Sequence, residues 1–359
     1  MAKRRTNLPP GVLEPREAVL RMAPYSPPTS GRADKLRLDF NENTVGASPA
    51  VIDFLKEQLS SAGLAVYPEY SAAKRDLAAF FNVDADEFVM TNGTDEAIQV
   101  LINTYVDDND EVIVLAPSYA MYRFYAEVAG ARVREIPYLP EKLAFPVDEL
   151  LGAINENTRA VLIANPNNPT GTGTTRAVIE SILDRATNAA VLVDEAYYEF
   201  CGVTALPLLN DYPNLFVSRT FSKVYGMAAM RLGCLFSQSG NTEFLHKAQS
   251  PYSVNSIAAL AARAAIRDTA YIRKYVTEVL AARELLYFEF EQMGIEYYPS
   301  QANFVLFRAG DRAIPIRDEL RRRGVLVRDR SYEIAGCVRV TCGTRDQIRR
   351  FIEELKSIW

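Results

Sequence analysis

The chain has 359 residues and 48% of them are hydrophobic, so it can bury a large core, which we expect to be split between two domains. Its formal net charge of -5 argues against a nucleic-acid partner. The start, Met1-Ala-Lys-Arg-Arg5, is basic, but no apolar segment follows it, so we expect a disordered arm and not a signal peptide or membrane anchor. The expected location is the cytoplasm, with no membrane partner.

The four cysteines and the single histidine do not indicate a metal site. Their spacing does not match that of metal ligands, and two of the cysteines fall in or near strand-like runs. We therefore expect no metal and free, buried thiols at Cys201, Cys234, Cys337 and Cys342.

The segment Thr91-Asn-Gly-Thr-Asp-Glu96 is followed by apolar residues that are spaced as one face of a helix. Free backbone N–H groups at the start of that helix would face a phosphate, and Gly93 permits close approach of the backbone. Thr94 and Asp95 either contact this phosphate or cap the helix, and the local sequence favours neither interpretation.

Three apolar runs further along end in polar or aromatic residues. Tyr119 follows the run 111–115, where its ring could stack on a flat ligand, although packing is the commoner role. The run 160–164 leads into the turn-rich segment Asn165-Pro-Asn-Asn-Pro-Thr-Gly-Thr172. Asp194 closes the run 190–193, at the carboxyl end of a buried strand, where open α/β sheets bind ligands. The alternatives are a helix cap for Asp194 and an ordinary loop for the asparagine segment.

The segment Ser218-Arg-Thr-Phe-Ser-Lys-Val-Tyr-Gly-Met-Ala-Ala-Met-Arg231 follows another apolar run, 215–217. A partly desolvated Lys223 could lose its proton near neutral pH and form a Schiff base, while Arg231 fixes a phosphate with help from Thr220 and Ser222. The alternative is a solvated helix face. Taken with Asp194, which could pair with a protonated pyridine nitrogen, the pattern predicts a pyridoxal phosphate (PLP) site.

The alternation of strands and helices predicts an α/β fold with a mainly parallel sheet, with a last strand expected at 231–236. Helices are expected from 257 to 293, and the strand-like runs 303–307, 325–327 and 337–341 indicate a smaller α+β domain. We expect residues 1–40 to form an arm and part of the small domain, 41–256 the large PLP-binding domain, and 257–359 the small C-terminal domain.

These motifs, in this order, resemble those of fold-type I PLP-dependent aminotransferases, and most of all those of histidinol-phosphate aminotransferases. The match runs nearly end to end. Besides the motifs above, it includes Ala23-Pro-Tyr25, Leu38-Asp-Phe-Asn-Glu-Asn43, Tyr67-Pro-Glu69, Val327-Arg-Asp329 and Val338-Arg-Val-Thr-Cys-Gly-Thr344.

The resemblance implies a role for each candidate residue. The catalytic set is the Schiff-base lysine Lys223, the pyridine partner Asp194, and Tyr197, which with Asn168 binds the phenolic oxygen. Tyr119 stacks on the cofactor ring. The cofactor phosphate is held by Gly93, Thr94, Asp95, Thr220, Ser222 and Arg231. Tyr67 serves the phosphate of a neighbouring subunit, which implies a homodimer with shared active sites. The substrate residues are Arg339 for the α-carboxylate, Arg328 and Tyr25 for a substrate phosphate, and Asn43.

Two departures from the family pattern concern the substrate. Thr44 stands where the family usually has proline, and residues 332–335 stand where it often has an extra amide. The basic cluster 321–323 is expected to be a solvated helix face.

The predicted reaction is transamination between a small-molecule amino donor and a 2-oxo acid, with histidinol phosphate and 2-oxoglutarate as the first choice. An aromatic amino acid is the second choice of donor, because Tyr25, Tyr119 and Tyr122 suit flat rings. Threonine-phosphate decarboxylation on the same fold is a third possibility. A PLP-binding regulator is a non-enzymatic alternative, which the intact set of Lys223, Asp194 and Arg339 opposes.

Overall fold

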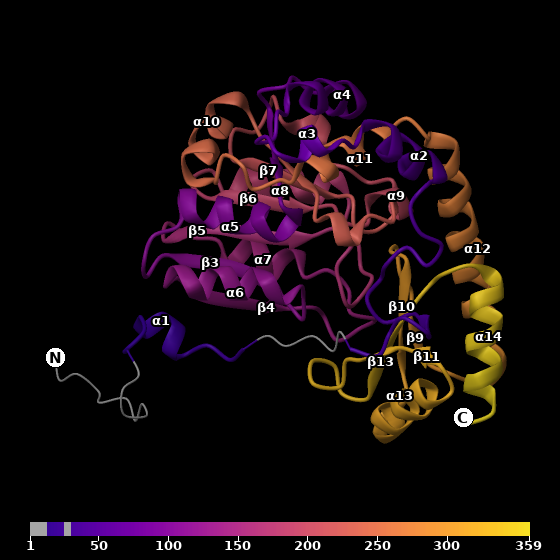
Figure 1. The fold of residues 1–359 in the computed structure, drawn as a ribbon. Coiled ribbons are helices and arrows are strands. Elements are labelled where there is room, and N and C mark those ends of the chain that lie inside the picture. The colour runs from indigo at the N-terminus through magenta and orange to yellow at the C-terminus, as the bar shows by residue number, and fades with distance from the viewer. Residues whose placement is uncertain (1–12, 25–29) are drawn as a thin grey trace.

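The computed structural model describes residues 13–24 and 30–359, so the prediction for Tyr25 lies outside the described residues. A seven-stranded sheet in the order β2-β8-β7-β6-β5-β3-β4 forms the centre of the large domain (Figure 1). Only β8 runs antiparallel to its neighbours, so the predicted mainly parallel sheet is confirmed. The strands are β2 (Phe88–Thr91), β3 (Glu111–Ala116), β4 (Arg132–Pro137), β5 (Thr158–Ala164), β6 (Ala190–Asp194), β7 (Leu215–Thr220) and β8 (Gly233–Phe236).

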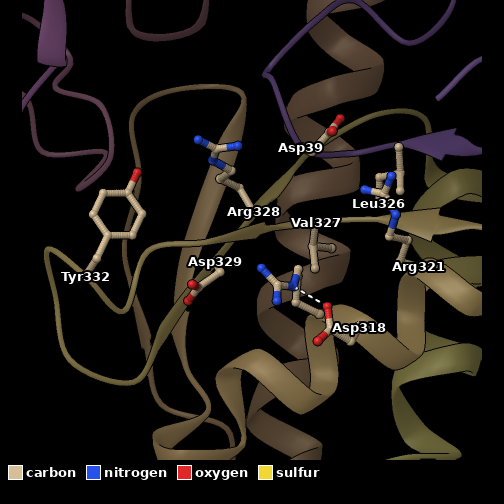
Figure 2. A pocket seen from close by; sticks show the side chains of 9 residues that line it. Asp39, Asp318, Arg321, Leu326, Val327, Arg328, Asp329 and Tyr332 are labelled. Atoms are coloured by element: carbon tan, nitrogen blue, oxygen red, sulfur yellow. Dashed lines mark ion pairs between the residues drawn. The ribbon is translucent and has the colours of Figure 1, made fainter. Parts of the chain in front are cut away.

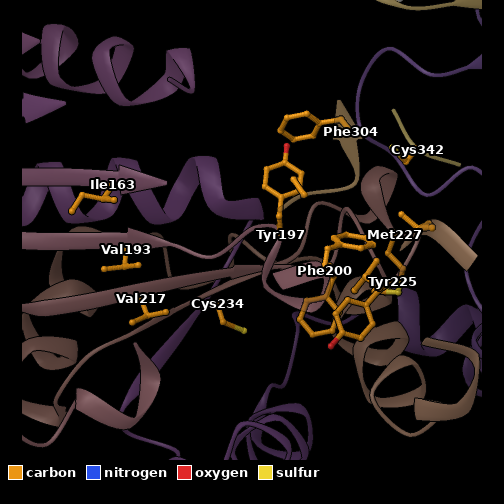
Figure 3. Packing of buried hydrophobic residues seen from close by; sticks show 14 of the residues in the cluster. Ile163, Val193, Tyr197, Phe200, Val217, Tyr225, Met227, Cys234, Phe304 and Cys342 are labelled. Carbon is orange, nitrogen blue, oxygen red and sulfur yellow. The ribbon is translucent and has the colours of Figure 1, made fainter. Parts of the chain in front are cut away.

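Helices cover both faces of this sheet. Side chains alternate between the faces along each strand, so the apolar strands present apolar side chains on both faces, and each face is buried by helices. One face, which carries Leu162 and Leu192, packs against α5 (Gly93–Tyr105), α6 (Ala120–Ala129) and α10 (Ser239–Ala248). The opposite face, which carries Ile163 and Val193, belongs to the larger core that Figure 3 shows. The helices in that core include α7 (Val147–Ala153), α8 (Arg176–Arg185), α2 (Pro49–Gln58), α4 (Ser71–Phe81) and α11 (Ser256–Ala265).

The small domain contains a four-stranded antiparallel sheet in the order β12-β13-β10-β9. Its strands are β9 (Tyr297–Tyr298), β10 (Phe304–Arg308), β12 (Arg328–Asp329) and β13 (Cys337–Thr341), and its helices are α13 (Ala313–Arg322) and α14 (Arg345–Lys356). The long helix α12 (Thr269–Met293) connects the two domains (Figure 1). β1 (Leu36–Arg37) pairs with β11 (Val325–Leu326), which brings the segment before residue 40 against this domain. The domain boundaries themselves stay a prediction.

Three more α-helices are short: α1 (Glu17–Leu20), α3 (Ser61–Leu64) and α9 (Tyr198–Cys201), the last of which buries Phe200 in the larger core. Three of the four free thiols are buried as expected, and Cys201 is half-buried. In the part of the chain that the structure describes, no helix is long and apolar enough to cross a membrane. The cytoplasmic location stays a prediction.

A glycine holds the segment around Lys223 close to the loop that follows β1. Gly226 has a φ of +69°, and a Cβ at this position would lie 2.4 Å from the carbonyl carbon and oxygen of Gly46. The amide of Asn43 joins the same two segments by donating to the Val224 carbonyl at 2.9 Å. The position of Lys223 therefore depends on close backbone contact at Gly226.

We predict that Gly226→Ala lowers the stability of the protein by at least about 1–2 kcal/mol, because alanine is strained at this φ and its Cβ would clash with Gly46. The measurement is the midpoint of thermal unfolding. Gly152→Ala in α7 is the matched control, since a Cβ there meets nothing within 4 Å. Equal midpoints for the two variants would show that the contact imposes no constraint.

Candidate active site

A cavity of about 590 Å³ lies between the large sheet and the small domain, and most of the predicted site residues line it. It is situated at the carboxyl ends of β5, β6 and β7, as expected for an open parallel sheet. The predicted residues brought together here are Thr94, Asp95, Tyr119, Asn168, Asp194, Tyr197, Thr220, Ser222, Lys223, Arg231, Arg328 and Arg339.

Asp194 is the last residue of β6 and is 4% exposed. Its carboxylate accepts hydrogen bonds from the Tyr122 hydroxyl at 2.7 Å and from the Ser218 hydroxyl at 2.8 Å. Burial raises the pKa of Asp194, and these two donors act in the opposite direction. A buried carboxylate fixed from two sides can accept a proton or a cationic N–H in the cavity, so the geometry favours the ligand-binding interpretation over a helix cap.

Lys223 lies on the loop that follows β7, and its Nζ donates to the carbonyl of Phe40 at 3.0 Å. Burial, with a smaller contribution from the positive charge of Arg339, lowers the pKa of Lys223 to about 8. A substantial fraction of the amine is therefore neutral near physiological pH, which is the form that acts as a nucleophile or base.

The first turn of α5 lies beside a guanidinium group. Arg231 has a φ of 54°, so it does not belong to β8, and the prediction that this strand begins at 231 was wrong. Its Nη1 donates to the Ser222 hydroxyl at 3.3 Å, and a Cβ on Gly93 would lie 2.4 Å from its Nη2. Because the residue before α5 makes no side-chain cap, the N–H groups at the start of the helix and this guanidinium form a site suited to phosphate.

Asp95 makes contacts that differ from those predicted. Its carboxylate accepts hydrogen bonds from Arg231 Nη2 at 3.0 Å and from the Tyr119 hydroxyl at 2.6 Å. A negative side chain repels a phosphate, so its geometry supports a role in holding Arg231 and Tyr119 and not a direct side-chain contact with the phosphate.

The opposite wall comes from the small domain and from the loop after β1. The amide of Asn41 donates to the Tyr197 hydroxyl at 2.9 Å. Arg339, on β13, donates through Nη1 to the side-chain oxygen of Asn168 and through Nη2 to the carbonyl of Asp39 at 2.6 Å. Burial, followed by the charges of two neighbouring arginines, lowers the pKa of Arg339 to about 10. Its Nε is buried and has no hydrogen-bond partner among the described residues.

Three of the predicted residues that the structure describes do not line the cavity: Gly93, which lies against the Arg231 guanidinium, Asn43 and Tyr67. Besides its bond to Val224, Asn43 accepts hydrogen bonds from the N–H groups of Val45 and Gly46, so its amide braces the loop, and its contact with a substrate stays a prediction. Tyr67 is 77% exposed and stacks on Tyr252 with ring centroids 4.6 Å apart.

Sequence reasoning missed several residues that the structure brings to the cavity or to Asp194. Tyr122 was considered only as an aromatic wall, although its hydroxyl binds Asp194. Ser218 is directly opposite Asp194 in the register of β6 and β7. The others, in the loop between β12 and β13, are Arg330, Tyr332 and Glu333. The signal that could have found Ser218 is its place at the end of a strand adjacent to that of Asp194.

The fold is the α/β fold of PLP-dependent aminotransferases. A solved histidinol-phosphate aminotransferase from Sinorhizobium meliloti, in complex with pyridoxal-5'-phosphate, matches with a TM-score of 0.88 over 97% of this chain and all of that chain, at 22% identity. A family model described as aminotransferase class I and II matches residues 33–355, so the chain belongs to that family and is an aminotransferase. The predicted fold class and enzyme class are confirmed.

Curated relatives match over nearly their whole length. The chain is 38% identical to a histidinol-phosphate aminotransferase of Symbiobacterium thermophilum over 356 residues, which cover 95% of this chain and 98% of the relative. It is 35% identical to a histidinol-phosphate aminotransferase of Geobacillus sp. over 353 residues, which cover 94% and 96% of the two chains.

We predict that Lys223 in the cofactor-free protein titrates near pH 8 and that Arg339→Met raises its pKa, because a positive neighbour disfavours the charged amine. The pKa should stay below 10.5 in the variant, since burial is the larger cause. The measurement is labelling by an amine-specific reagent as a function of pH, followed by peptide mass spectrometry, with the exposed Lys274 as internal reference. An unchanged midpoint in the variant would contradict the electrostatic coupling.

Proposed function

We propose that the chain is a PLP-dependent transaminase that uses histidinol phosphate and 2-oxoglutarate. The observation that carries this proposal is that a buried lysine of lowered pKa and a buried, doubly hydrogen-bonded aspartate line the same cavity. Curated relatives that match nearly end to end are named for the same reaction.

The residues present fit PLP. Its phosphate would be held by the first turn of α5, the hydroxyls of Thr220 and Ser222, and the guanidinium of Arg231, which Asp95 keeps in place. The Tyr119 ring lines the same cavity and would stack on the cofactor ring, while Asn168 and Tyr197 would bind its phenolic oxygen. When bound, PLP supplies an electron sink for the carbanion that is left when the substrate loses its α-proton.

The chain's own residues hold and move the protons. Asp194 would keep a proton on the cofactor nitrogen, since Tyr122 and Ser218 fix its carboxylate and stabilise the charged form. Lys223 would bind the cofactor covalently through Nζ and, after release by the amino donor, carry the substrate's α-proton between carbon atoms. Its lowered pKa favours both tasks near neutral pH.

Arginines at the small-domain wall support an anionic substrate. Arg339 is positioned by Asn168 and Asp39 to bind an α-carboxylate in bidentate fashion. Arg328 also lines the cavity and would bind the phosphate of histidinol phosphate.

We also propose a homodimer in which Tyr67 serves the phosphate site of the neighbouring subunit. Tyr67 is exposed and does not line the cavity of its own chain, which supports a role outside that chain. Other exposed apolar residues in the same segment, Leu64 at 63% and Val66 at 67%, are suited to burial against a second copy.

Covalent mapping tests the cofactor assignment. After borohydride reduction of the purified holoenzyme, the pyridoxyl group should be found on Lys223, because this lysine is buried in the cavity and its pKa is lowered. Lys223→Ala should lose nearly all turnover, whereas Lys35→Ala, on the outside of the cavity, should keep it. Labelling of any other lysine in the wild-type protein would refute the assignment.

Arginine variants separate the candidate substrates. Arg328→Ala should lower kcat/KM for histidinol phosphate about 10- to 150-fold, because it removes a charge-assisted contact worth roughly 1.5–3 kcal/mol. Phenylalanine, which has no distal anion, should be affected little. Arg339→Ala should instead impair amino acids that bring an α-carboxylate, such as glutamate and phenylalanine.

The measurement is steady-state kinetics of both variants with all three donors. If the wild-type enzyme is inactive on histidinol phosphate and fast on phenylalanine, the substrate is an aromatic amino acid and the proposed substrate is wrong. The assignment to the aminotransferase class would still hold.

A further inference from the structure

Three arginines share one face at the edge of the small-domain sheet. Arg328 and Arg339 are directly opposite each other in the antiparallel pair of β12 and β13. Arg330 follows two residues after Arg328, and its N–H still donates to the Cys337 carbonyl at 2.9 Å, so strand alternation directs it to the same face. All three line the active-site cavity. Figure 2, which views the adjoining pocket, shows the guanidinium of Arg328 and the hydroxyl of Tyr332 on the side away from Asp329.

This arrangement leaves an excess of positive charge. Like charges directly opposite on a sheet are destabilising, and burial increases the cost because Arg330 and Arg339 are 7% and 4% exposed. Two carboxylates from the β1 loop and the β12–β13 loop face this wall. Glu333 pairs with Arg330. Glu42 shares Arg32 with Asp39 and also lies 3.7 Å from Arg37, so these two carboxylates are balanced by two other arginines. The three arginines and Glu333 therefore leave a net charge of about +2, which matches a phosphate monoester carrying up to two negative charges.

The hydrogen bonds of Arg330 leave it able to bind a ligand. Its Nη1 donates to the Tyr332 hydroxyl at 2.9 Å and its Nη2 contacts the Glu333 carboxylate. Its Nε is buried and has no hydrogen-bond partner among the described residues. A guanidinium has five N–H donors, so several remain free after these two contacts. The ion pair with Glu333 thus holds the group without using up its donors.

We propose that Arg330 is a specificity-determining residue that binds, with Arg328, the doubly charged end group of the amino substrate, and that Glu333 is its positioning residue. The inference rests on the proposed function and extends it. The chemical class recognised is a phosphate monoester distal to the reacting amine. Arg330 supplies a second set of donors to that group, and Glu333 holds the guanidinium against repulsion from Arg328 and Arg339.

The experiment compares holoenzymes carrying Arg330→Gln, the double change Arg330→Gln with Glu333→Gln, and Arg321→Gln. The double variant avoids an unpaired buried Glu333, so a loss that it shares with the single variant does not come from that unpaired charge. Arg321→Gln is the matched control, because it removes a nearby positive charge that does not line the active-site cavity. The measurements are kcat and KM with histidinol phosphate and phenylalanine, and the competitive inhibition constant of inorganic phosphate.

Both Arg330 variants should raise KM for histidinol phosphate and the inhibition constant of phosphate by about 10- to 100-fold, with a fall in the histidinol phosphate to phenylalanine specificity ratio. Arg321→Gln should behave like the wild type. Two outcomes would overturn the inference and leave the proposed function standing, provided that the wild type turns over histidinol phosphate. In the first, the Arg330 variants keep the wild-type KM for histidinol phosphate. In the second, they lose kcat equally for both donors. If the wild type does not use histidinol phosphate but Arg330→Gln still weakens phosphate inhibition, the proposed function fails and the assignment of Arg330 as an anion-binding residue is supported.

Discussion

The common end of three parallel strands is the constraint on which the rest of the site depends. Ala164, Asp194 and Ser218 lie side by side in the register of β5, β6 and β7. Because parallel strands expose their carboxyl ends at one edge, the loops that carry Asn168 and Lys223 open into the same cavity as Asp194. The sheet is buried on both faces, so the strands fix where these groups start, and further hydrogen bonds orient the side chains of Asp194 and Lys223.

Placing ionisable groups at this edge has an electrostatic cost, which the structure offsets differently at each position. Burial disfavours the charge on Asp194, and two hydroxyl donors restore part of its stability. Burial lowers the pKa of Lys223, whose Nζ donates to a carbonyl, and the positive charge of Arg339 lowers this pKa further. The same burial therefore gives a fixed carboxylate at the end of β6 and a readily deprotonated amine on the loop after β7, the pair of properties that proton transfer at carbon requires.

Much of this could be predicted from the sequence, because apolar runs and the polar residues that close them are local signals. Apolar runs predicted the strands at 160–164, 190–193 and 215–217, and these three strands are confirmed. The polar residues that follow them were singled out in the same way. Contacts that depend on distant partners could not be predicted. Asp95 binds Arg231, 136 positions later, and the amide of Asn43 binds the backbone at Val224. Arg330 lies on the same face as Arg328 and Arg339 only because β12 and β13 pair in one particular register.

The two domains consequently contribute different things to the site. The large-domain wall holds the groups suited to a cofactor and to proton transfer, and these groups lie at or near the ends of strands or the starts of helices around one sheet. The small-domain wall holds cations whose mutual repulsion is relieved when an anion enters. Since such relief is available only to a charged ligand, we expect this wall to discriminate between donors by the charge of their end group. Substrate choice can therefore change through a few residues between β12 and β13 while the reaction stays the same.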